Sequence, residues 1–307
     1  MRRRRSWNWT GSLQTASKPG CPCPPSTRSA CSGRVAAPAS PAGTKRIVIQ
    51  DTVAIRDLVS QAEWSTRVEL AAAYRLVAHF GMTELTGNHI SCCVPGEPGH
   101  FLINPYGMLY EDVTASSLIK IDLEGQVVLS TGEYGVNRAG FVIHAAIHAA
   151  RPDAFCVAHT HTAAGMAVSA LKCGLLPVSQ TSMRFLHAAY HDFDGLAENE
   201  AIGRKIVADL GDHDVMIMRN HGLLVCGWTI GDTFTLLWRL ERACQTQLMA
   251  MACASPLVEP DPAICESVYQ TLHRDLRRKK VTGSSDYQSP WPALLKKMVK
   301  LDPSFQD

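Results

Sequence analysis

The chain has 307 residues, of which 46% are hydrophobic and 19% are charged, so it can bury the core of one large domain or two small ones. The net charge is +2, yet residues 1–50 contain nine Lys or Arg and no Asp or Glu, which leaves the remainder slightly acidic. This balance argues against nucleic acid as a partner of the folded part. The apolar runs are too short to span a bilayer, so we expect no membrane segment.

Eleven cysteines are scattered through the chain without any Cys-x-x-Cys pair, which excludes a zinc ribbon and a thioredoxin-type motif. Cys156 and Cys226 lie in apolar runs, where a thiol behaves as a small buried hydrophobe. Free thiols of this kind are typical of a reducing compartment, and we expect a cytoplasmic protein.

Residues 1–50 are rich in Arg, Ser, Pro, Gly and Ala and have no apolar periodicity that could define a buried face. We interpret them as a disordered tail or as sequence translated from a misplaced start codon. A transit peptide is the alternative, which Pro24 and Pro25 disfavour because they oppose an amphipathic helix.

A folded domain is expected over residues 60–255. Thr66 and Glu69 form a capping-box pattern ahead of an apolar stripe, which predicts a helix that begins near Thr66 and ends at Gly81. Short strands are then predicted at 89–94, 101–104, 118–122 and 127–130, because turn dipeptides separate these runs. Their spacing indicates an antiparallel meander.

From residue 139 the pattern alternates between helices and strands. We expect helices at 139–150, 163–171, 199–210 and 229–252, and strands at 154–159, 215–218 and 223–226. Helices on both sides of one mixed sheet are the architecture that this order favours. Residues 256–307 form a C-terminal tail with a helix at 263–276, which we expect to wrap the domain or to mediate a contact.

Two histidines, His159 and His161, lie at the end of the predicted strand 154–159. Strand residues two apart project to the same side, so both imidazoles can bind one ion. Such a pair also arises by chance in a chain with twelve histidines, and two ordinary strand-end residues are the alternative interpretation.

A third histidine, His221, follows the apolar strand 215–218 and precedes Gly222, which allows a sharp turn beside a site. Three neutral imidazoles leave coordination positions open, as in a catalytic rather than a structural metal site. The sequence therefore predicts one divalent ion on His159, His161 and His221. Zinc fits best, and iron(II) and manganese(II) are the alternatives.

His144 and His148 are four residues apart on the predicted helix 139–150, but the segment lacks the glutamate of a metalloprotease motif. We interpret this pair as packing residues or as hydrogen-bond partners of the site rather than as ligands.

Several segments together resemble the class II aldolase/adducin domain family, over about residues 65–255. They lie at 86–91, 103–107, 114–118, 151–153, 159–162 and 220–222. The resemblance implies a three-layer α/β/α fold around a central mixed, largely antiparallel sheet, with the metal on His159, His161 and His221. It also implies a homo-oligomer, a tetramer with the site near a subunit interface.

The chain departs from the sugar-phosphate aldolases that it resembles. In those enzymes the metal polarises a hydroxy-ketone and a glutamate moves the proton, but Gly140 stands at the position of that glutamate. Tyr106 replaces a threonine of the phosphate site, where Gly87 and Asn88 remain. A sugar phosphate is therefore not expected. Substrate contacts are expected instead from Gly87, Asn88, Tyr106, Gly107 and Arg138, the last pairing with a carboxylate.

Three functions remain open. The first is a metal-dependent lyase, which cleaves or decarboxylates a small hydroxy- or oxo-acid. Its candidate catalytic residues are Glu133, Tyr190 and Asp192, with Tyr106 and His191 as further candidates for proton transfer. The second is an iron(II) oxygenase on the same histidines. The third is a non-catalytic module with an actin or cytoskeletal partner, because residues 110–118, 136–141 and 169–180 look like adducin sequence.

Overall fold

The computed structural model describes residues 47–48, 54–132, 134–196, 200–282 and 289–307, with the side chains of 47–48 and 274–282 left out. The expectation for residues 1–50 lies outside this part of the chain, apart from the two-residue strand β1 (Ile47–Val48). Within the described residues one nine-stranded sheet forms, in the order β1-β5-β4-β3-β2-β6-β9-β8-β7.

Four consecutive strands form the predicted antiparallel meander. They are β2 (His89–Cys93), β3 (His100–Ile103), β4 (Ile119–Asp122) and β5 (Val127–Ser130). The sheet continues antiparallel from β2 into β6 (Cys156–Thr160), β9 (Gly222–Gly227) and β8 (Val215–Met218). Only the outer pairs are parallel in the described sheet, namely β1 with β5 and β7 (Ala189–His191) with β8. The prediction of a mixed, largely antiparallel sheet is confirmed.

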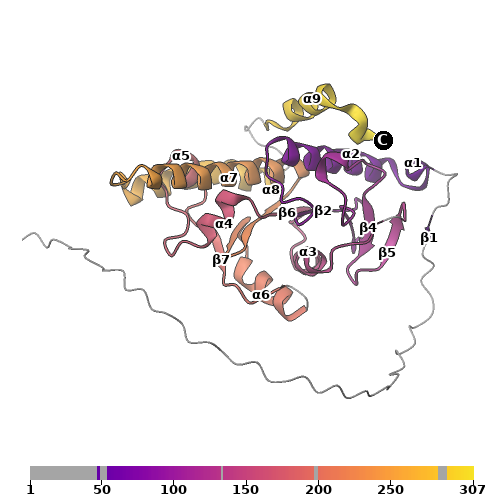
Figure 1. Cartoon of the computed structure of the whole chain (residues 1–307), viewed down its shortest axis with the longest axis horizontal. Helices are drawn as coiled ribbons and strands as arrows, with labels where there is room; N and C mark the ends of the chain where they lie inside the picture. Colours follow the sequence, from indigo (N-terminus) through magenta and orange to yellow (C-terminus); the bar gives the residue numbers. More distant parts are fainter. Residues whose placement is uncertain (1–46, 49–53, 133, 197–199, 283–288) are drawn as a thin grey trace, which may run out of the picture. The chain divides into compact units, whose positions relative to one another are not determined.

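Helices cover both faces of the sheet, as Figure 1 shows, so the predicted three-layer α/β/α architecture is confirmed. One face carries α2 (Gln61–His79) and α7 (Ile230–Ala252), and the other carries α3 (Arg138–Ala150) and α6 (Glu200–Leu210). Alternate residues of β2 divide between these layers. Ile90 and Cys92 join the core under α2 and α7, while His89 and Ser91 face α3.

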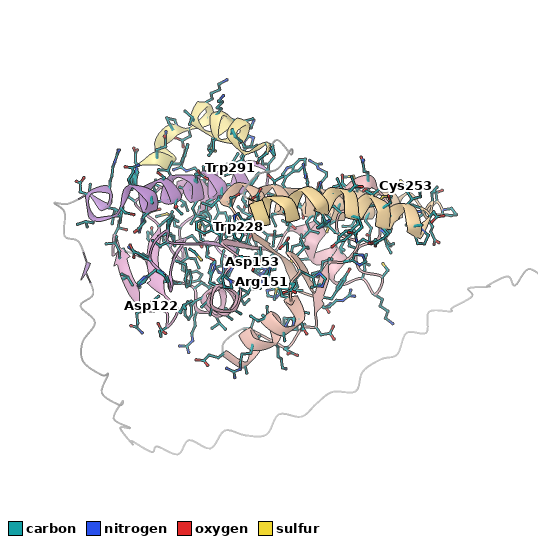
Figure 2. The ribbon with its side chains drawn as sticks, turned by 180° about the vertical axis from the view of Figure 1, so that it is seen from behind. Asp122, Arg151, Asp153, Trp228, Cys253 and Trp291 are labelled. Carbon is teal, nitrogen blue, oxygen red and sulfur yellow. The ribbon has the colours of Figure 1, made fainter. Side chains whose placement is uncertain are left out.

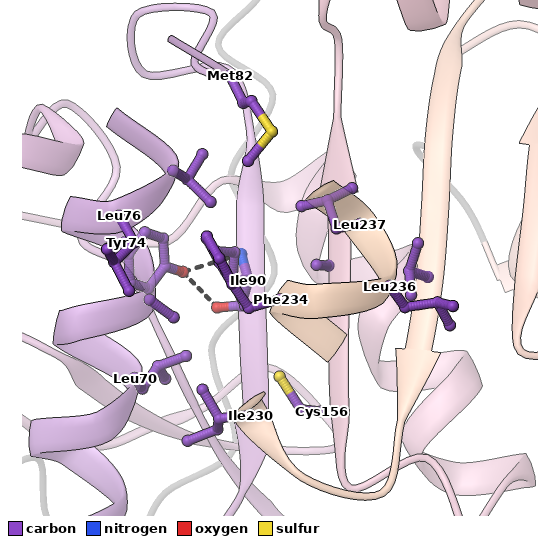
Figure 3. Close-up of a cluster of buried hydrophobic side chains, with 14 of the residues drawn as sticks. Leu70, Tyr74, Leu76, Met82, Ile90, Cys156, Ile230, Phe234, Leu236 and Leu237 are labelled. Atoms are coloured by element: carbon purple, nitrogen blue, oxygen red, sulfur yellow. Dashed lines mark hydrogen bonds between the residues drawn. The ribbon is translucent and has the colours of Figure 1, made fainter. Parts of the chain in front are cut away.

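The larger hydrophobic core contains the hydrogen-bonded hydroxyl of a tyrosine, shown in Figure 3. The hydroxyl of Tyr74 on α2 donates to the carbonyl of Ile90, and it accepts from the Ile90 amide at 2.9 Å. Burial of that hydroxyl would be costly without such partners. These two hydrogen bonds therefore fix α2 against the start of β2, which lies beside the predicted site.

The predicted start of the first long helix was wrong. Helix α2 begins at Gln61, and its N-cap is Ser60, whose side chain accepts from the Glu63 amide. Thr66 instead donates to the carbonyl of Ala62 inside the helix. The extra turn is stabilised by tertiary contacts, because Glu63 pairs with both Arg67 and Lys120 of β4 in the interior. A local capping pattern cannot reveal contacts of that kind.

Several short elements were not predicted. They are α1 (Ile55–Leu58), α5 (Gln180–Met183), β7, the C-terminal helix α9 (Trp291–Leu301) and the 3-10 helices η1 (Tyr110–Asp112) and η2 (Pro303–Gln306). Helix α4 (Ala163–Ser169) matches its prediction, and α8 (Pro262–Thr282) is longer than predicted.

The C-terminal tail packs on α2. The indole of Trp291, labelled in Figure 2, donates to Glu69 at 3.0 Å, and Arg75 pairs with Asp302. The Ala115 amide donates to the carbonyl of Phe305. These contacts lie on the face of the domain opposite α3.

An ion pair and hydrogen bonds of Arg151 fix the C-terminal end of α3. Arg151 pairs with Asp153 through Nε and Nη2, and its Nη1 donates to the carbonyls of Gly211 and His213 between α6 and β8 (Figure 2). This arginine therefore fixes the helix that runs over β2 and β6.

Candidate metal centre

Three histidines converge at one edge of the sheet. His159 is in β6, His161 follows that strand, and His221 lies in the turn just before β9. Since β6 and β9 are antiparallel neighbours, the end of one meets the beginning of the other. The Nε2 atom of His159 lies 2.7 Å from that of His161 and 3.2 Å from that of His221. In the described chain this is the group of side chains suited to holding a metal ion.

The hydrogen bonds of the Nδ1 atoms determine whether the converging Nε2 atoms carry a proton or a lone pair. His159 Nδ1 is 2.9 Å from the carbonyl oxygen of Leu223, which can only accept, so this nitrogen carries the proton. His161 Nδ1 lies 2.5 Å from a carboxylate oxygen of Glu84 and donates to it. In the neutral rings both Nε2 atoms then present lone pairs to each other at 2.7 Å. Such an arrangement is repulsive unless a cation binds both, and it therefore fits a divalent metal ion.

Burial favours the neutral form of His159 and His221, which is the form that ligates a metal. The pKa of His159 lies well below the usual value for histidine because of burial, and the neighbouring His221 and His161 lower it further. The pKa of His221 falls to about 4, again mainly through burial and then through His161. At neutral pH, His159 and His221 are thus ready to bind without releasing a proton.

The turn at 84–88 supplies a residue that the sequence did not reveal. Glu84 orients His161 from 77 positions away, and no spacing pattern links the two. The Glu84 amide donates to Oδ1 of Asn88, while the Gly87 amide donates to the Glu84 carbonyl. A Cβ on Gly87 would lie 3.1 Å from the Glu84 carboxylate. The predicted substrate loop therefore also holds the hydrogen-bond partner of a predicted metal ligand.

Gly222 allows the two turns to approach each other. A Cβ at this position would lie 2.4 Å from the carbonyl oxygen of Thr160 and 3.1 Å from the His161 ring. Asn220, two residues before it in the same turn, adopts a positive φ of 54°. The His-Gly pattern thus has a steric cause.

The predicted substrate residues lie in different settings. Asn88 is fully buried, and its Nδ2 has no hydrogen-bond partner among the described residues. Tyr106 is half-exposed, and Gly107 next to it faces the ring of Tyr134. Arg138 is exposed at the first turn of α3. These substrate contacts stay predictions.

The predicted catalytic residues are more scattered. Glu133 lies outside the described residues. The Tyr190 hydroxyl accepts from the Leu175 amide at 3.0 Å, and Arg219 stacks on its ring. Asp192 is exposed just after β7, whose last residue, His191, pairs with Asp209. Their catalytic roles also stay predictions.

Two further histidines lie next to the three predicted metal ligands. His89 pairs with His159 in the sheet, and their rings are nearly parallel with centroids 6.5 Å apart. His144 of α3 meets His89 edge to face at 5.9 Å. Burial, helped by His161 and His221, lowers the pKa of His89 to about 4. The sequence had singled out His144 as a partner of the site but had assigned no role to His89.

Known proteins resemble this chain over the same region. The sequence profile of the class II aldolase and adducin N-terminal domain matches residues 68–248. A Pseudomonas aeruginosa protein named for the class 2 aldolases is 44% identical over 249 residues, which are 81% of this chain and 94% of that protein. Alpha-adducin of Rattus norvegicus is 47% identical over 190 residues, which are 61% of this chain but 26% of adducin.

Solved structures agree with the fold. An aldolase II superfamily protein from Pseudomonas syringae matches with a TM-score of 0.76 and 41% identity, covering 83% of this chain and all of that one. An L-fuculose 1-phosphate aldolase from Glaciozyma antarctica matches with a TM-score of 0.69 and 27% identity, covering 85% of this chain and 98% of that one. Among the described residues, no helix combines the length and apolar character needed to cross a bilayer.

Proposed function

Because this chain belongs to the class II aldolase and adducin N-terminal domain family, we propose that it is a metal-dependent lyase for a small hydroxy- or oxo-acid. The reaction is aldol cleavage or decarboxylation. One observation carries this proposal: the Nε2 lone pairs of His159 and His161 face each other while their Nδ1 atoms are held by Leu223 and Glu84. A scaffold has no need for such an arrangement.

The proposed ion is zinc, with iron or manganese as alternatives, because imidazole nitrogens suit these metals. Held by the three histidines, such an ion would supply a Lewis acid for polarising a substrate oxygen. The chain's own residues hold and orient the ligands, and Glu84 fixes the ring of His161. An iron(II) oxygenase is distinguished by uptake of O₂, which neither aldol cleavage nor decarboxylation requires.

The proposed substrate carries a carboxylate rather than a sugar phosphate. Arg138 is exposed at the start of α3, where a guanidinium can pair with a carboxylate. Asn88 adds a buried amide donor on the opposite loop. Gly140 provides no carboxylate at the position where the resemblance places the acid/base glutamate of the sugar-phosphate enzymes.

Metal analysis tests the proposal directly. We expect about one divalent ion per chain in gently purified protein, loss of that ion in His159→Ala, and retention in His79→Ala, which changes an exposed residue at the end of α2. A panel of small hydroxy- and oxo-acids, assayed for CO₂ and for carbonyl products, then identifies the reaction. Metal-free wild-type protein would contradict the proposal.

A binding module is the second candidate, and the observation that favours it is the 47% identity to alpha-adducin. Since the chain covers 26% of that protein, the comparison concerns one domain of it. Co-sedimentation with actin filaments at physiological salt tests this alternative. Pelleting of metal-free His159→Ala as efficient as that of wild type would support a binding role independent of the metal.

We also propose a homo-oligomer, a tetramer by family resemblance. Light scattering coupled to size-exclusion chromatography gives the mass directly, to be compared with 33.5 kDa for one chain. A monomer that turns over substrate would show that the site is complete within one subunit.

A further inference from the structure

A buried carboxylate of α7 reaches the segment that follows a predicted metal ligand. Glu241 is 5% exposed, and its Oε2 atom accepts a hydrogen bond from the hydroxyl of Thr162, which comes directly after His161. Thr162 is itself buried. Helix α7 packs on β6, β9 and α4. Glu241 therefore approaches the three histidines from the layer of helices opposite α3.

The Thr162 hydroxyl acts as donor and acceptor at once. It donates to Glu241, and it accepts from the Gly165 amide at 3.2 Å, which makes Thr162 the N-cap of α4. A hydroxyl has a single proton, so the direction of both hydrogen bonds is determined. Together they fix the segment between His161 and the first turn of α4.

Gly165 brings this segment against the strand that orients His159. A Cβ on Gly165 would lie 2.7 Å from Thr162 Oγ1 and 2.7 Å from Leu223 Cγ. Leu223 of β9 is the residue whose carbonyl accepts from His159 Nδ1. A displacement of Thr162 would therefore disturb the surroundings of both His161 and His159.

The charge of Glu241 is a second observation. Its Oε1 atom accepts from the side-chain amide of Gln245 at 2.8 Å, so the two donors, Thr162 and Gln245, are both neutral. Burial of a carboxylate is costly unless a cation compensates its charge. A divalent ion on three neutral imidazoles in turn needs negative charge nearby. Glu84 beside His161 and Glu241 beside Thr162 each place a carboxylate next to this segment.

We propose that Glu241 is a positioning residue of the metal centre, which holds His161 in place through the Thr162 hydroxyl and stabilises the bound ion through its negative charge. This inference rests on the metal binding in the proposed function. It gives α7 a part in metal affinity, although neither Glu241 nor Thr162 is a predicted ligand.

Competition for zinc(II) between the full-length protein and a chromophoric chelator tests the hydrogen bond. Thr162→Val keeps the shape of the side chain and removes the hydroxyl. We expect zinc affinity to fall about tenfold, the low end of the range for lost outer hydrogen bonds of a metal site, and to stay within about twofold of wild type in Thr162→Ser. Thr271→Val is the matched control, because its exposed hydroxyl donates to the Ser267 carbonyl far along the chain on α8.

Glu241→Gln tests the charge. The amide keeps an oxygen that accepts from Thr162 but carries no charge, so we expect zinc affinity to fall about three- to tenfold. The urea midpoint of the metal-free variant should equal or exceed that of wild type, since a buried charge has been removed. A purely structural role predicts the opposite pattern, a lower midpoint with unchanged zinc affinity, and that result would overturn the inference.

The same titrations separate this inference from the proposed function. Wild-type protein that binds no zinc would overturn both. Zinc-binding wild type together with wild-type zinc affinity in either Thr162→Val or Glu241→Gln would overturn the role of Glu241 alone.

Discussion

Gly140 of α3 and His89 of β2 share one space, because a Cβ on the glycine would lie 2.5 Å from three atoms of the imidazole. The absence of a side chain at 140 and the presence of a ring at 89 are therefore one structural feature. Where the resemblance places a glutamate on the helix, this chain places an imidazole from the sheet. The consequence is a neutral imidazole beside the three predicted ligand histidines instead of a carboxylate.

Because the two residues share this space, the effect of Gly140→Ala on the free energy of unfolding should depend on whether the His89 ring is present. Gly140→Ala is expected to lower the free energy of unfolding by about 1–2 kcal/mol, because overpacking costs more than the gain of up to about 1 kcal/mol in helix propensity. In a His89→Ala background the ring is gone, and the same substitution is expected to be neutral or stabilising. Urea unfolding of the four metal-free proteins measures the cycle, and equal effects in both backgrounds would show that the two residues do not compete.

Glu84 is predicted to control metal affinity through His161. Glu84→Gln removes the charge that orients the ring from its Nδ1 side, and loss of such a partner typically weakens metal binding about 10- to 100-fold. Competition with a metal chelator measures the change. Glu111→Gln, at an exposed position in η1, is the matched control and should bind metal like wild type. Equal metal affinities for Glu84→Gln and the control would show that Glu84 does not contribute to metal binding.

The His-Gly turn predicts a steric requirement at position 222. In Gly222→Ala the added methyl group meets the Thr160 carbonyl at 2.4 Å, so the turn that carries His221 must move away from His161. We expect metal content to fall below about one tenth of the wild-type value, because three ligands must stay within a fixed distance of one ion. Gly135→Ala, where a Cβ meets nothing within 4 Å, should keep its metal. Full metal content in Gly222→Ala would mean that the turn adapts.

Buried histidines predict that the metal-free protein loses stability in acid. Burial lowers the pKa of both His89 and His148 to about 4, against about 6.5 for an unfolded histidine. Between these values the unfolded chain binds protons that the folded chain does not, so the free energy of unfolding falls as the pH falls. The stability is fully present above about pH 6.5 and is lost progressively toward pH 4.

Urea midpoints of metal-free protein at pH 7.5 and pH 5 measure this loss. His148 lies against Ser91, Cys93, Phe101 and the Ala154 carbonyl, at a distance from the ligand histidines that makes it the cleaner position to change. His148→Gln cannot titrate, and its midpoint should fall less between the two pH values than that of wild type. A fall of the same size in both proteins would assign the acid sensitivity to other groups.

Much of the fold and the convergence of His159, His161 and His221 could be predicted from the sequence because the signals are local. Turn residues mark the strand at 89–94, and a continuous apolar run indicates the strand at 215–218. Helical periodicity indicates 139–150 and 229–252, since burial of one helix face requires it. His159, His161 and His221 each lie at the end of an apolar strand, which places them at a sheet edge. The actual start of α2 at Gln61 was missed, because that turn depends on the buried Glu63, Arg67 and Lys120.

The tertiary structure alone decided what surrounds the three histidines. Glu84 reaches His161 across 77 positions, and the hydrogen bonds of Ser91 with His144 and His148 join β2 to α3 across 53 and 57 positions. Such contacts depend on the register in which β2 pairs with β6 and on how α3 packs over both strands. No local pattern encodes them, since any histidine on an apolar face can equally be a packing residue. The sequence by itself thus determined which residues can bind a metal and that position 140 has no carboxylate, and the packing of α3 on the sheet decided that the imidazole of His89 lies beside them.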